Sequence, residues 1–472
     1  MQHRLALKCT RCNKVYEFSV DRKLCEKCGC GLSVETEGSV EFSENGRGQG
    51  IWRHAQLFPY VDREFHFSLG EGNTCLIESA RLKSELGLRE LWFKNETTEP
   101  TGSYFDRSSA LFVSLIKSLG YERIVTYSTG NLAASLAAYS SRIGIKLHVN
   151  VRPMVDVGKL YQMILYGAKV NVLQDFSKTR ISSEEALAIE YDPIINEAKK
   201  TILLEIFLQL DKRLPEYIIL PMGEGGLVYF TYKMLVELKR VFGDVEFKTK
   251  IVGVQPRGCS PIVEAYERGL DEVYTDTKFF TRIFDLSVVR PRYGSAALKA
   301  IRNTGGYAVS VSEEEYYRAL SMLAEMEGIL AEPAASLSLA GLIKLRRLGV
   351  IGDNSTVVCV ITGGGLKDPK IMKDIACKKS DVGLLLEELS GDMKMGKTKR
   401  AILELLSVED MYGYQIWRSL REKYGLSMRI PSVYQHLNQL IEMGYIRKTF
   451  SKNVLGRRRE YYSLTDKGRI VV

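Results

Sequence analysis

The sequence predicts an α/β protein with a small cysteine-rich piece at its amino terminus and a basic, helical piece at its carboxyl terminus. Between them, short apolar runs alternate with helix-like segments, which is the pattern of parallel sheets covered by helices. The 472 residues are 45% hydrophobic and 26% charged, a composition typical of globular proteins. We expect three domains, at residues 1–35, 66–380 and 397–472, with 36–65 as an irregular connector.

Six apolar runs mark the strands that are expected in the central domain. Segments with helical character separate them, so the strands are expected to form parallel sheets. The runs are 123–127, 146–151, 169–173, 217–220, 250–254 and 355–361. No apolar run approaches the ~20 residues that a membrane helix needs, and the first residues lack the apolar core of a signal peptide. We therefore expect a cytoplasmic protein with no membrane partner.

The net charge of +9 is concentrated in the last part of the chain. Residues 391–472 contain 16 Lys and Arg against 8 Asp and Glu, whereas the first 390 residues carry a net charge of only +1. A basic balance confined to one small domain predicts a polyanionic partner for that domain. A solvated basic face is the alternative interpretation.

Five of the nine cysteines lie within the first 30 residues, and four of them form two Cys-x-x-Cys pairs. Cys9 and Cys12 are separated from Cys25 and Cys28 by 12 residues. Two such knuckles close a tetrahedral site for Zn²⁺ with no open position, so we expect a structural zinc ion. Metal binding would supply the folding free energy of a piece this small. A reduced cysteine cluster, or a set in which Cys30 replaces one ligand, is the alternative.

Six motifs in the central domain resemble those of the threonine synthase family in order and spacing. They are 68–74 (SLGEGNT), 100–107 (PTGSYFDR), 128–131 (STGN), 223–226 (GEGG), 332–336 (EPAAS) and 362–368 (TGGGLKD). The resemblance covers about residues 67–377. It implies a pyridoxal-phosphate (PLP) enzyme body of fold type II, with the two lobes of a tryptophan synthase β-like protein.

The resemblance also implies where a ligand would bind. A turn of small residues at the start of a helix leaves N–H groups free for a carboxylate or phosphate, and glycines let the backbone approach closely. In the family, one such turn binds the acid group of the substrate, with its Asn beside the cofactor's ring hydroxyl. A glycine turn holds the cofactor's phosphate, and a hydroxyl residue bonds to the pyridine nitrogen. The matching ligand- or cofactor-binding residues are Ser103, Ser128, Thr129, Gly130, Asn131, Gly223, Gly225, Gly226 and Thr362.

Phe105 stands where the family has the lysine that holds PLP as a Schiff base. A benzyl side chain can neither form an imine nor shuttle protons. The family's Asn-Pro-Tyr-Arg-x-x-Gly stretch is also not recognisable before residues 199–201, and Lys94 is the only lysine expected near the motif. Glu224 departs from the family too, because a carboxylate in the glycine turn would repel a phosphate unless it points away.

These departures predict a cleft that binds a ligand without catalysis. The expected ligand is an amino acid, a phosphorylated amino acid such as O-phosphohomoserine, or PLP held without a covalent bond. The alternative is that PLP does not bind, and that the Phe105 ring itself fills the position of the cofactor ring.

Residues 397–472 resemble the winged-helix domain of PadR-like transcription regulators. The matching segments are 401–406 (AILELL), 412–416 (YGYQI), 431–434 (PSVY), 444–446 (GYI), 457–462 (RRREYY) and 464–468 (LTDKG). Leu437 and Leu440 also match. Tyr434, Leu437, Leu440 and Ile441 repeat at helical spacing and predict the core face of a recognition helix.

The opposite face of that helix offers short polar groups for base edges or phosphates in a major groove, and the hairpin tip that follows forms a basic wing. The expected DNA-binding residues are Ser432, Gln435, His436, Gln439, Lys452, Arg457, Arg458 and Arg459. The expected partner is double-stranded DNA; a winged helix that binds protein is the alternative.

Together these patterns predict a ligand-sensing transcription regulator. PadR-like proteins usually dimerise through a further helix, and none follows residue 469 here, so the body is expected to form the homodimer that spaces two recognition helices. Two alternatives remain open. One is an active PLP-dependent threonine synthase-like lyase, and the other is a partner-binding pseudoenzyme.

Overall fold

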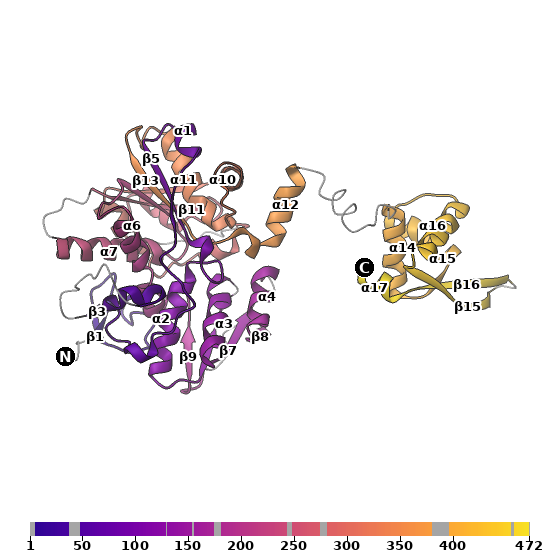
Figure 1. Ribbon diagram of the computed structural model, residues 1–472, viewed down its shortest axis with the longest axis horizontal. Helices are drawn as coiled ribbons and strands as arrows, with labels where there is room; N and C mark the ends of the chain where they lie inside the picture. The colour runs from indigo at the N-terminus through magenta and orange to yellow at the C-terminus, as the bar shows by residue number, and fades with distance from the viewer. Residues whose placement is uncertain are drawn as a thin grey trace. The chain divides into compact units, whose positions relative to one another are not determined.

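The computed structural model describes most of the chain, which forms two compact units. The first unit runs from Met1 to Lys373 and the second from Asp374 to Val472. Figure 1 shows both units with their helices and strands labelled. The described residues are 5–36, 48–128, 130–152, 155–173, 181–242, 248–273, 281–379, 396–454 and 457–471. Within these ranges, no helix combines the length and the apolar character that crossing a membrane requires.

The larger lobe of the first unit is built on a six-stranded sheet in the order β12-β11-β10-β13-β5-β4. Neighbouring strands are parallel except for β4, which runs antiparallel to β5. The central strands are buried throughout, as parallel strands covered by helices on both faces must be. The strands are β4 (Leu76–Glu78), β5 (Glu90–Asn95), β10 (Tyr217–Pro221), β11 (Lys250–Pro256), β12 (Tyr307–Val311) and β13 (Thr356–Ile361).

Helices and short 3₁₀ turns complete this lobe. In Figure 1, α10 and α11 lie at the upper end of the unit; α11 packs against β10, β11, β12 and β13, and α10 packs against α11. The helices are α1 (Leu82–Glu85), α6 (Lys200–Gln209), α7 (Gly226–Phe242), α8 (Pro261–Glu267), α9 (Gly294–Asn303), α10 (Glu313–Glu327) and α11 (Pro333–Arg347), with η3 (Glu96–Thr98), η5 (Phe284–Leu286) and η6 (Gly365–Lys367). The next helix, α12 (Pro369–Lys379), spans the boundary between the two units.

The smaller lobe contains a four-stranded parallel sheet in the order β8-β7-β6-β9. Helix α3 packs against both α2 and α4, and the three helices lie together at the lower end of the unit in Figure 1. The elements are β6 (Arg123–Thr126), β7 (Lys146–Val151), β8 (Lys169–Val172), β9 (Glu185–Ala188), α2 (Phe105–Ser118), α3 (Asn131–Ile143), α4 (Val157–Leu165) and α5 (Pro193–Glu197).

The six strands expected from the sequence are confirmed as β6, β7, β8, β10, β11 and β13, with ends shifted by at most two residues. The strands β4, β5, β9 and β12 were not among the runs named as examples. In β9, the segment Glu185–Ala188 contains no β-branched or aromatic residue, and its conformation comes from parallel pairing with β6. Tertiary pairing overrides local preference at such positions.

The cysteine-rich piece forms an antiparallel sheet in the order β2-β1-β3 and shares a core with the body. The hydroxyl of Tyr293 donates to the Leu32 carbonyl at 2.6 Å. The Glu197 carboxylate accepts from the Val34 N–H at 3.0 Å and pairs with the Lys233 ammonium at 2.6 Å. The piece is therefore a part of the first unit. Its strands are β1 (Leu5–Cys9), β2 (Val15–Glu17) and β3 (Leu32–Thr36).

The described part of the connector, residues 48–65, is more ordered than the sequence predicted. It contains the 3₁₀ helices η1 (Gly50–Leu57) and η2 (Arg63–Phe65). Trp52 anchors it, because its indole N–H donates to the Phe67 carbonyl at 2.8 Å and its ring stacks on His66 at 4.0 Å. The sequence interpretation gave weight to glycines and missed this buried aromatic anchor.

The second unit is a winged helix. Its three-stranded sheet has the order β14-β16-β15, and β15 and β16 form the antiparallel hairpin that was expected. Its elements are α14 (Lys397–Val408), β14 (Met411–Tyr412), α15 (Gly413–Tyr424), α16 (Ile430–Glu442), β15 (Ile446–Val454), β16 (Arg457–Leu464) and α17 (Asp466–Val471).

One core position predicted for the recognition helix α16 is wrong. Val433, Leu437 and Leu440 are fully buried, whereas Tyr434 is 37% exposed. Tyr434 lies one residue after Val433, which rotates it by about 100° away from the core. Its ring instead covers Gly413, where an added Cβ would lie only 2.5 Å from the ring.

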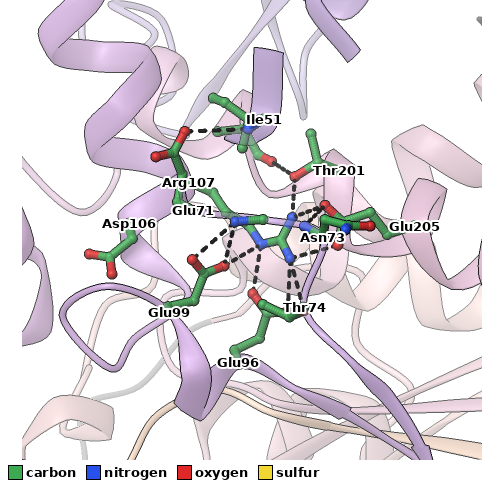
Figure 2. A network of polar contacts seen from close by, with 12 residues as sticks. Ile51, Glu71, Asn73, Thr74, Glu96, Glu99, Asp106, Arg107, Thr201 and Glu205 are labelled. Carbon is green, nitrogen blue, oxygen red and sulfur yellow. Dashed lines mark hydrogen bonds and ion pairs between the residues drawn. The ribbon is translucent and has the colours of Figure 1, made fainter. Parts of the chain in front are cut away.

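Arg107 lies at the centre of a buried network that ties four segments of the first unit together (Figure 2). Its guanidinium donates to Glu96 at 2.6 and 3.0 Å and to Glu205 at 2.6 and 2.8 Å. It also donates to the hydroxyls of Thr74 at 3.1 Å and Thr201 at 3.0 Å. Arg107 belongs to α2, and its partners come from three other segments: Glu96 from η3, Glu205 from α6 and Thr74 from the loop before β4.

The charges in this network balance. The Lys94 ammonium pairs with Glu205 at 2.6 Å and adds a second cation. Glu99 lies 3.0 Å from Arg107, and burial raises the pKa of Glu99 well above its usual range. The carboxylates of Glu96 and Glu205 thus face two cations, Arg107 and Lys94. Buried charges are tolerated when they are paired in this way.

Replacing Arg107 by Met should destabilise the first unit by about 3–5 kcal/mol, because two buried carboxylates lose their main partner. Urea unfolding followed by circular dichroism measures the shift in midpoint. The matched control is Arg123→Met, which removes a partly exposed ion pair with Glu184 and should cost less than about 1 kcal/mol. Equal shifts for the two variants would contradict a structural role for the network.

Candidate functional site

The loop that precedes α2 is held against the turn that follows β13. The Tyr104 N–H donates to the Thr362 carbonyl at 3.0 Å, and the Gly364 N–H donates to the Gly102 carbonyl at 3.0 Å. Within the loop, the Asp106 carboxylate accepts from the N–H and the hydroxyl of Thr101, both at 2.6 Å. These bonds place the first residue of α2, Phe105, next to Thr362.

Phe105 lines a cavity in the first unit. The predicted site residues Asn131, Gly223, Gly225, Gly226 and Thr362 line the same cavity. The volume of the cavity that the centre of a water-sized molecule can occupy is about 60 Å³. The cavity lies where turns follow parallel strands, which is the usual place for ligands in α/β folds. Four residues that the sequence did not single out for the site also line it: Glu190, Lys199, Asp285 and Glu332.

The glycine turn before α7 requires its glycines. Gly225 has φ +87°, and an added Cβ would lie 2.9 Å from the Tyr293 carbonyl oxygen. A Cβ on Gly226 would lie 2.1 Å from the Asn196 side-chain oxygen. The turn can therefore pack closely, while the first N–H groups of α7 have no partners within the helix and are suited to an anion.

The turn before α3 is described except for Thr129, a predicted site residue that lies outside the described residues. The Ser128 hydroxyl donates to Glu190 at 3.2 Å and accepts from the Gly130 N–H at 3.3 Å. The Asn131 amide donates to both oxygens of Glu332, at 3.1 and 2.8 Å. Its oxygen is buried and has no partner among the described residues, so it is available to a ligand.

Ser103 is fully buried behind the cavity wall rather than in the cavity lining. Its hydroxyl accepts from the Phe105 N–H at 3.4 Å, and its backbone pairs with Gly363. Ser103 therefore helps to shape the start of α2, and whether it contacts a ligand stays a prediction.

The expectation that Lys94 is the only lysine near the motif is wrong. Lys94 is held in the Arg107 network by Glu205. Lys199 instead lies at the cavity, with its ammonium 4.9 Å from the centre of the Phe105 ring and 5.3 Å from that of Tyr104. The chain places Lys199 between α5 and α6, and only packing of these helices brings it to Phe105. The pair of lysines after Asn196 was the only signal in the sequence.

Four carboxyl groups line the cavity, and their environments differ. Burial raises the pKa of Glu224 to about 8 and the pKa of Glu332 to about 7. Burial and the charge of Asp285 raise the pKa of Glu190. Asp285 forms an ion pair with the buried ammonium of Lys159. The cavity is therefore much less negative near neutral pH than its composition indicates.

Comparison with known families identifies the body. Residues 67–363 match the family described as pyridoxal-phosphate dependent enzymes. The chain belongs to the pyridoxal-phosphate dependent enzyme family. Threonine synthases are among its curated relatives. The one from Methanocaldococcus jannaschii is 35% identical over 413 residues, which cover 84% of this chain and 99% of the relative. The one from Methanosarcina acetivorans is 35% identical over 389 residues, which cover 80% and 95%.

Solved structures share the fold of this PLP-enzyme body. Maize serine racemase is 18% identical with a TM-score of 0.56, and the match covers 73% of this chain and 98% of that chain. The processed form of threonine deaminase isoform 2 from Solanum lycopersicum is 19% identical with a TM-score of 0.55, covering 72% and 97%. At these identities the likeness shows the fold alone, and it confirms the predicted two-lobed body of fold type II.

Several of the residues that the resemblance assigns to PLP line the cavity. Asn131, with its free oxygen, and Thr362 would hold the ring, and the glycine turn at Gly223, Gly225 and Gly226 would hold the phosphate. When bound, PLP supplies an electron sink for carbanion chemistry. The amine that would bind its aldehyde is missing at position 105.

The four predicted cysteine ligands come together in the amino-terminal sheet. The sulfurs of Cys9, Cys12, Cys25 and Cys28 all lie within 4.8 Å of one another, and the closest pairs are 3.4–3.8 Å apart. Four thiolates around Zn²⁺ at about 2.3 Å are separated by about 3.8 Å, so the arrangement fits a tetrahedral ion. Cys30 is not part of the set, and its sulfur faces the Cys28 carbonyl.

Residues 402–472 match the PadR-like family of transcriptional regulators. On the helix α16, Gln435 is exposed, whereas Ser432, His436 and Gln439 are half-buried. Asn438, which the sequence interpretation did not name, is exposed on the same helix. Base or phosphate contacts by these residues stay predictions.

The wing carries the basic residues that were expected. Lys452 on β15 and Arg458 on β16 are exposed. Arg459 is half-buried, with its guanidinium 5.5 Å from the centre of the Tyr412 ring, which indicates a packing role as well as a charge. The side chain of Arg457 lies outside the described residues.

The raised pKa of Glu224 predicts a pH dependence of stability. Folded Glu224 keeps its proton up to about pH 8, whereas an unfolded glutamic acid releases it near pH 4.5. Between these values the folded state binds more protons, so this group's contribution to stability falls as pH rises. Glu224→Gln stays neutral at every pH. Between pH 6 and pH 8 its melting temperature should therefore fall by at least about 2 °C less than that of the parent.

The control for this measurement is Glu64→Gln, because Glu64 is exposed on η2. Its melting temperature should follow the parent curve at every pH. A Glu224→Gln curve that runs parallel to the parent would show that Glu224 is not held protonated by its burial.

Proposed function

We propose that the chain is a transcription regulator whose PLP-enzyme body senses a small ligand and controls a winged helix that binds double-stranded DNA. One observation carries the proposal: Phe105 occupies the lysine position in a cavity whose glycine turn, Asn131 and Thr362 remain. A site of this kind can recognise a ligand but lacks the family's reactive amine. Because its partner is DNA, the regulator would act in the cytoplasm.

The ligand we propose is an amino acid, a phosphorylated amino acid or PLP held without a covalent bond. The free N–H groups at the start of α7 suit an anionic group. The unpartnered oxygen of Asn131 can accept from a ligand N–H or O–H. The raised pKa of Glu224 reduces the repulsion that its carboxylate would exert on a phosphate near neutral pH.

Control of DNA affinity requires that the ligand change the spacing or freedom of two winged helices. We propose that the body forms a homodimer and that ligand binding closes its two lobes. A coupling free energy of about 1–3 kcal/mol, which is typical of allosteric proteins, would change DNA affinity by about 5–150-fold. Two wings on a two-fold axis would bind a palindromic site.

A PLP-dependent threonine synthase-like lyase is the second candidate function. The names of the relatives and the presence of Lys199 in the cavity favour it. The position of Phe105 opposes it.

DNA binding should depend on the wing. Replacing Arg457 and Arg458 by Ala should weaken binding to all sequences and reduce the slope of log K against log salt by up to about 2, since each lost phosphate contact removes about 0.9. Fluorescence anisotropy at several salt concentrations measures both effects. The control is Arg418→Ala, which removes an exposed charge on α15 that pairs with Glu422. An unchanged slope in the wing variant, with loss of binding to a protein partner, would favour a partner-binding pseudoenzyme.

We propose that the four-cysteine cluster holds a structural Zn²⁺ ion. The purified chain should contain about one zinc per chain by inductively coupled plasma mass spectrometry. Cys12→Ser should lose the metal and lower the melting temperature of the first unit, because the cysteine-rich piece shares its core with the body. Cys75→Ser, at an exposed cysteine outside the cluster, should change neither quantity. Zinc retained at full occupancy by Cys12→Ser would rule out the proposed ligand set.

A further inference from the structure

Lys199 places a primary amine at the cavity, beside the ring that replaced the family's lysine. It lies at the junction of α5 and α6, and its side chain is buried. Its ammonium bonds to the Asn196 side-chain oxygen at 2.8 Å and lies 4.9 Å from the centre of the Phe105 ring. Within the described part of the chain, Lys199 makes no ion pair.

The orientation of this amine is fixed by its neighbours. The Asn196 amide N–H groups donate to the carbonyls of Glu190 and Asp192, both at 2.8 Å. This leaves the Asn196 oxygen facing Lys199. The same oxygen would lie 2.1 Å from a Cβ on Gly226, so the amine is held at the start of α7. An anionic ligand bound to the first N–H groups of that helix would therefore lie next to Lys199.

The surroundings of Lys199 differ from those of two other buried lysines, Lys159 and Lys200. Burial also lowers the pKa of Lys367 to about 8, but Lys367 does not line this cavity. Ion pairs with carboxylates raise the pKa of Lys159 and of Lys200 despite their burial. Burial lowers the pKa of Lys199 to about 8, against the opposing charges of Glu190 and Glu224. With this pKa, roughly a tenth of the amine is unprotonated at pH 7, and the unprotonated amine is the form that acts as a nucleophile.

We propose that Lys199 captures a small carbonyl compound, an aldehyde or ketone that carries an anionic group, as a reversible imine. The inference rests on the proposed function in one respect: the cavity must bind a small ligand. It narrows the ligand class to carbonyl compounds and assigns the covalent contact to a residue outside the family's lysine position.

The bond changes are those of a simple condensation. The free amine of Lys199 attacks the carbonyl carbon to form a C–N bond, and the carbonyl oxygen takes up a proton. The nitrogen then loses a proton, the hydroxyl leaves as water, and a C=N bond replaces the C=O bond. No oxidant or further reactant is needed. Glu224 lines the same cavity, is protonated near neutral pH and can supply the proton to the leaving oxygen.

Borohydride trapping on the full-length chain tests the inference. The probes are pyridoxal 5′-phosphate and pyruvate, each at a few equivalents, followed by reduction with sodium borohydride, intact mass measurement and peptide mapping. We expect about one reduced adduct per chain, located on Lys199. Lys199→Met and Lys199→Arg should each lower the trapped adduct at least ten-fold, and the Arg variant separates loss of the nucleophile from loss of the charge.

The matched control is Lys239→Met, which removes an exposed lysine of α7 and should trap as much adduct as the parent. The folding of each variant is checked by far-ultraviolet circular dichroism. Adduct spread over exposed lysines, or retained in Lys199→Met, would overturn the assignment to Lys199.

The same samples, without reduction, separate this inference from the proposed function. If a probe raises the melting temperature of the parent and of Lys199→Met equally and traps no adduct, the cavity binds ligands non-covalently. In that case the role of Lys199 fails and the proposed function stands. If neither probe traps an adduct or raises the melting temperature, the carbonyl class is excluded, while DNA binding by the winged helix still tests the proposed function.

Discussion

The buried guanidinium of Arg107 is the constraint on which the cavity depends. Arg107 lies two residues after Phe105 on α2, and its carboxylate partners come from η3 and α6. The network therefore fixes where α2 begins and which way its first residues face. α6 follows Lys199 directly, so the same network also positions the amine. A buried cluster of this kind contributes to specificity more than to net stability, because desolvation offsets much of the attraction between its charges.

The proposed function requires a cavity that keeps its binding surfaces without the family's reactive lysine. Its glycine turn and its Asn131 offer backbone N–H groups and an amide to a ligand, and neither feature depends on a Schiff base. Phe105 adds an apolar wall next to Lys199, and the ring face attracts the ammonium of that lysine. Four carboxyl groups complete the lining, and burial keeps Glu224 largely protonated near neutral pH. The result is a small site with one amine and a polarity that changes with pH.

Much of the fold and part of the site could be predicted from the sequence. Strands such as β10 and β11 are short apolar runs bounded by turns, and the cysteine spacing predicted a cluster that the structure brings together. Asn131 and Thr362 were found because each follows a strand in a motif of known order. Exposure on α16 was harder to predict, since Val433 and Tyr434 are adjacent and only one of them faces the core. The predicted domain boundaries stay predictions.

The rest of the site depends on packing between distant segments. Lys199, Glu190 and Asp285 come from separate parts of the chain and belong to no motif. The local sequence therefore does not show which of the adjacent lysines, Lys199 or Lys200, lines the cavity. Lys94 was the lysine nearest to the motif in the sequence. Its ammonium bonds to Glu205, which lies 111 residues away along the chain, and Lys94 does not line the cavity. Pairings of this kind follow from the tertiary structure alone.

Release of phosphate from O-phosphohomoserine, measured on the full-length chain with excess PLP, tests most directly whether the body has lost catalysis. The account predicts no release above that of a sample without protein, because the cavity binds its ligand without turnover. Saturable release at about 1–10 per second, within the usual range of enzymes, would contradict it and identify the chain as an active lyase.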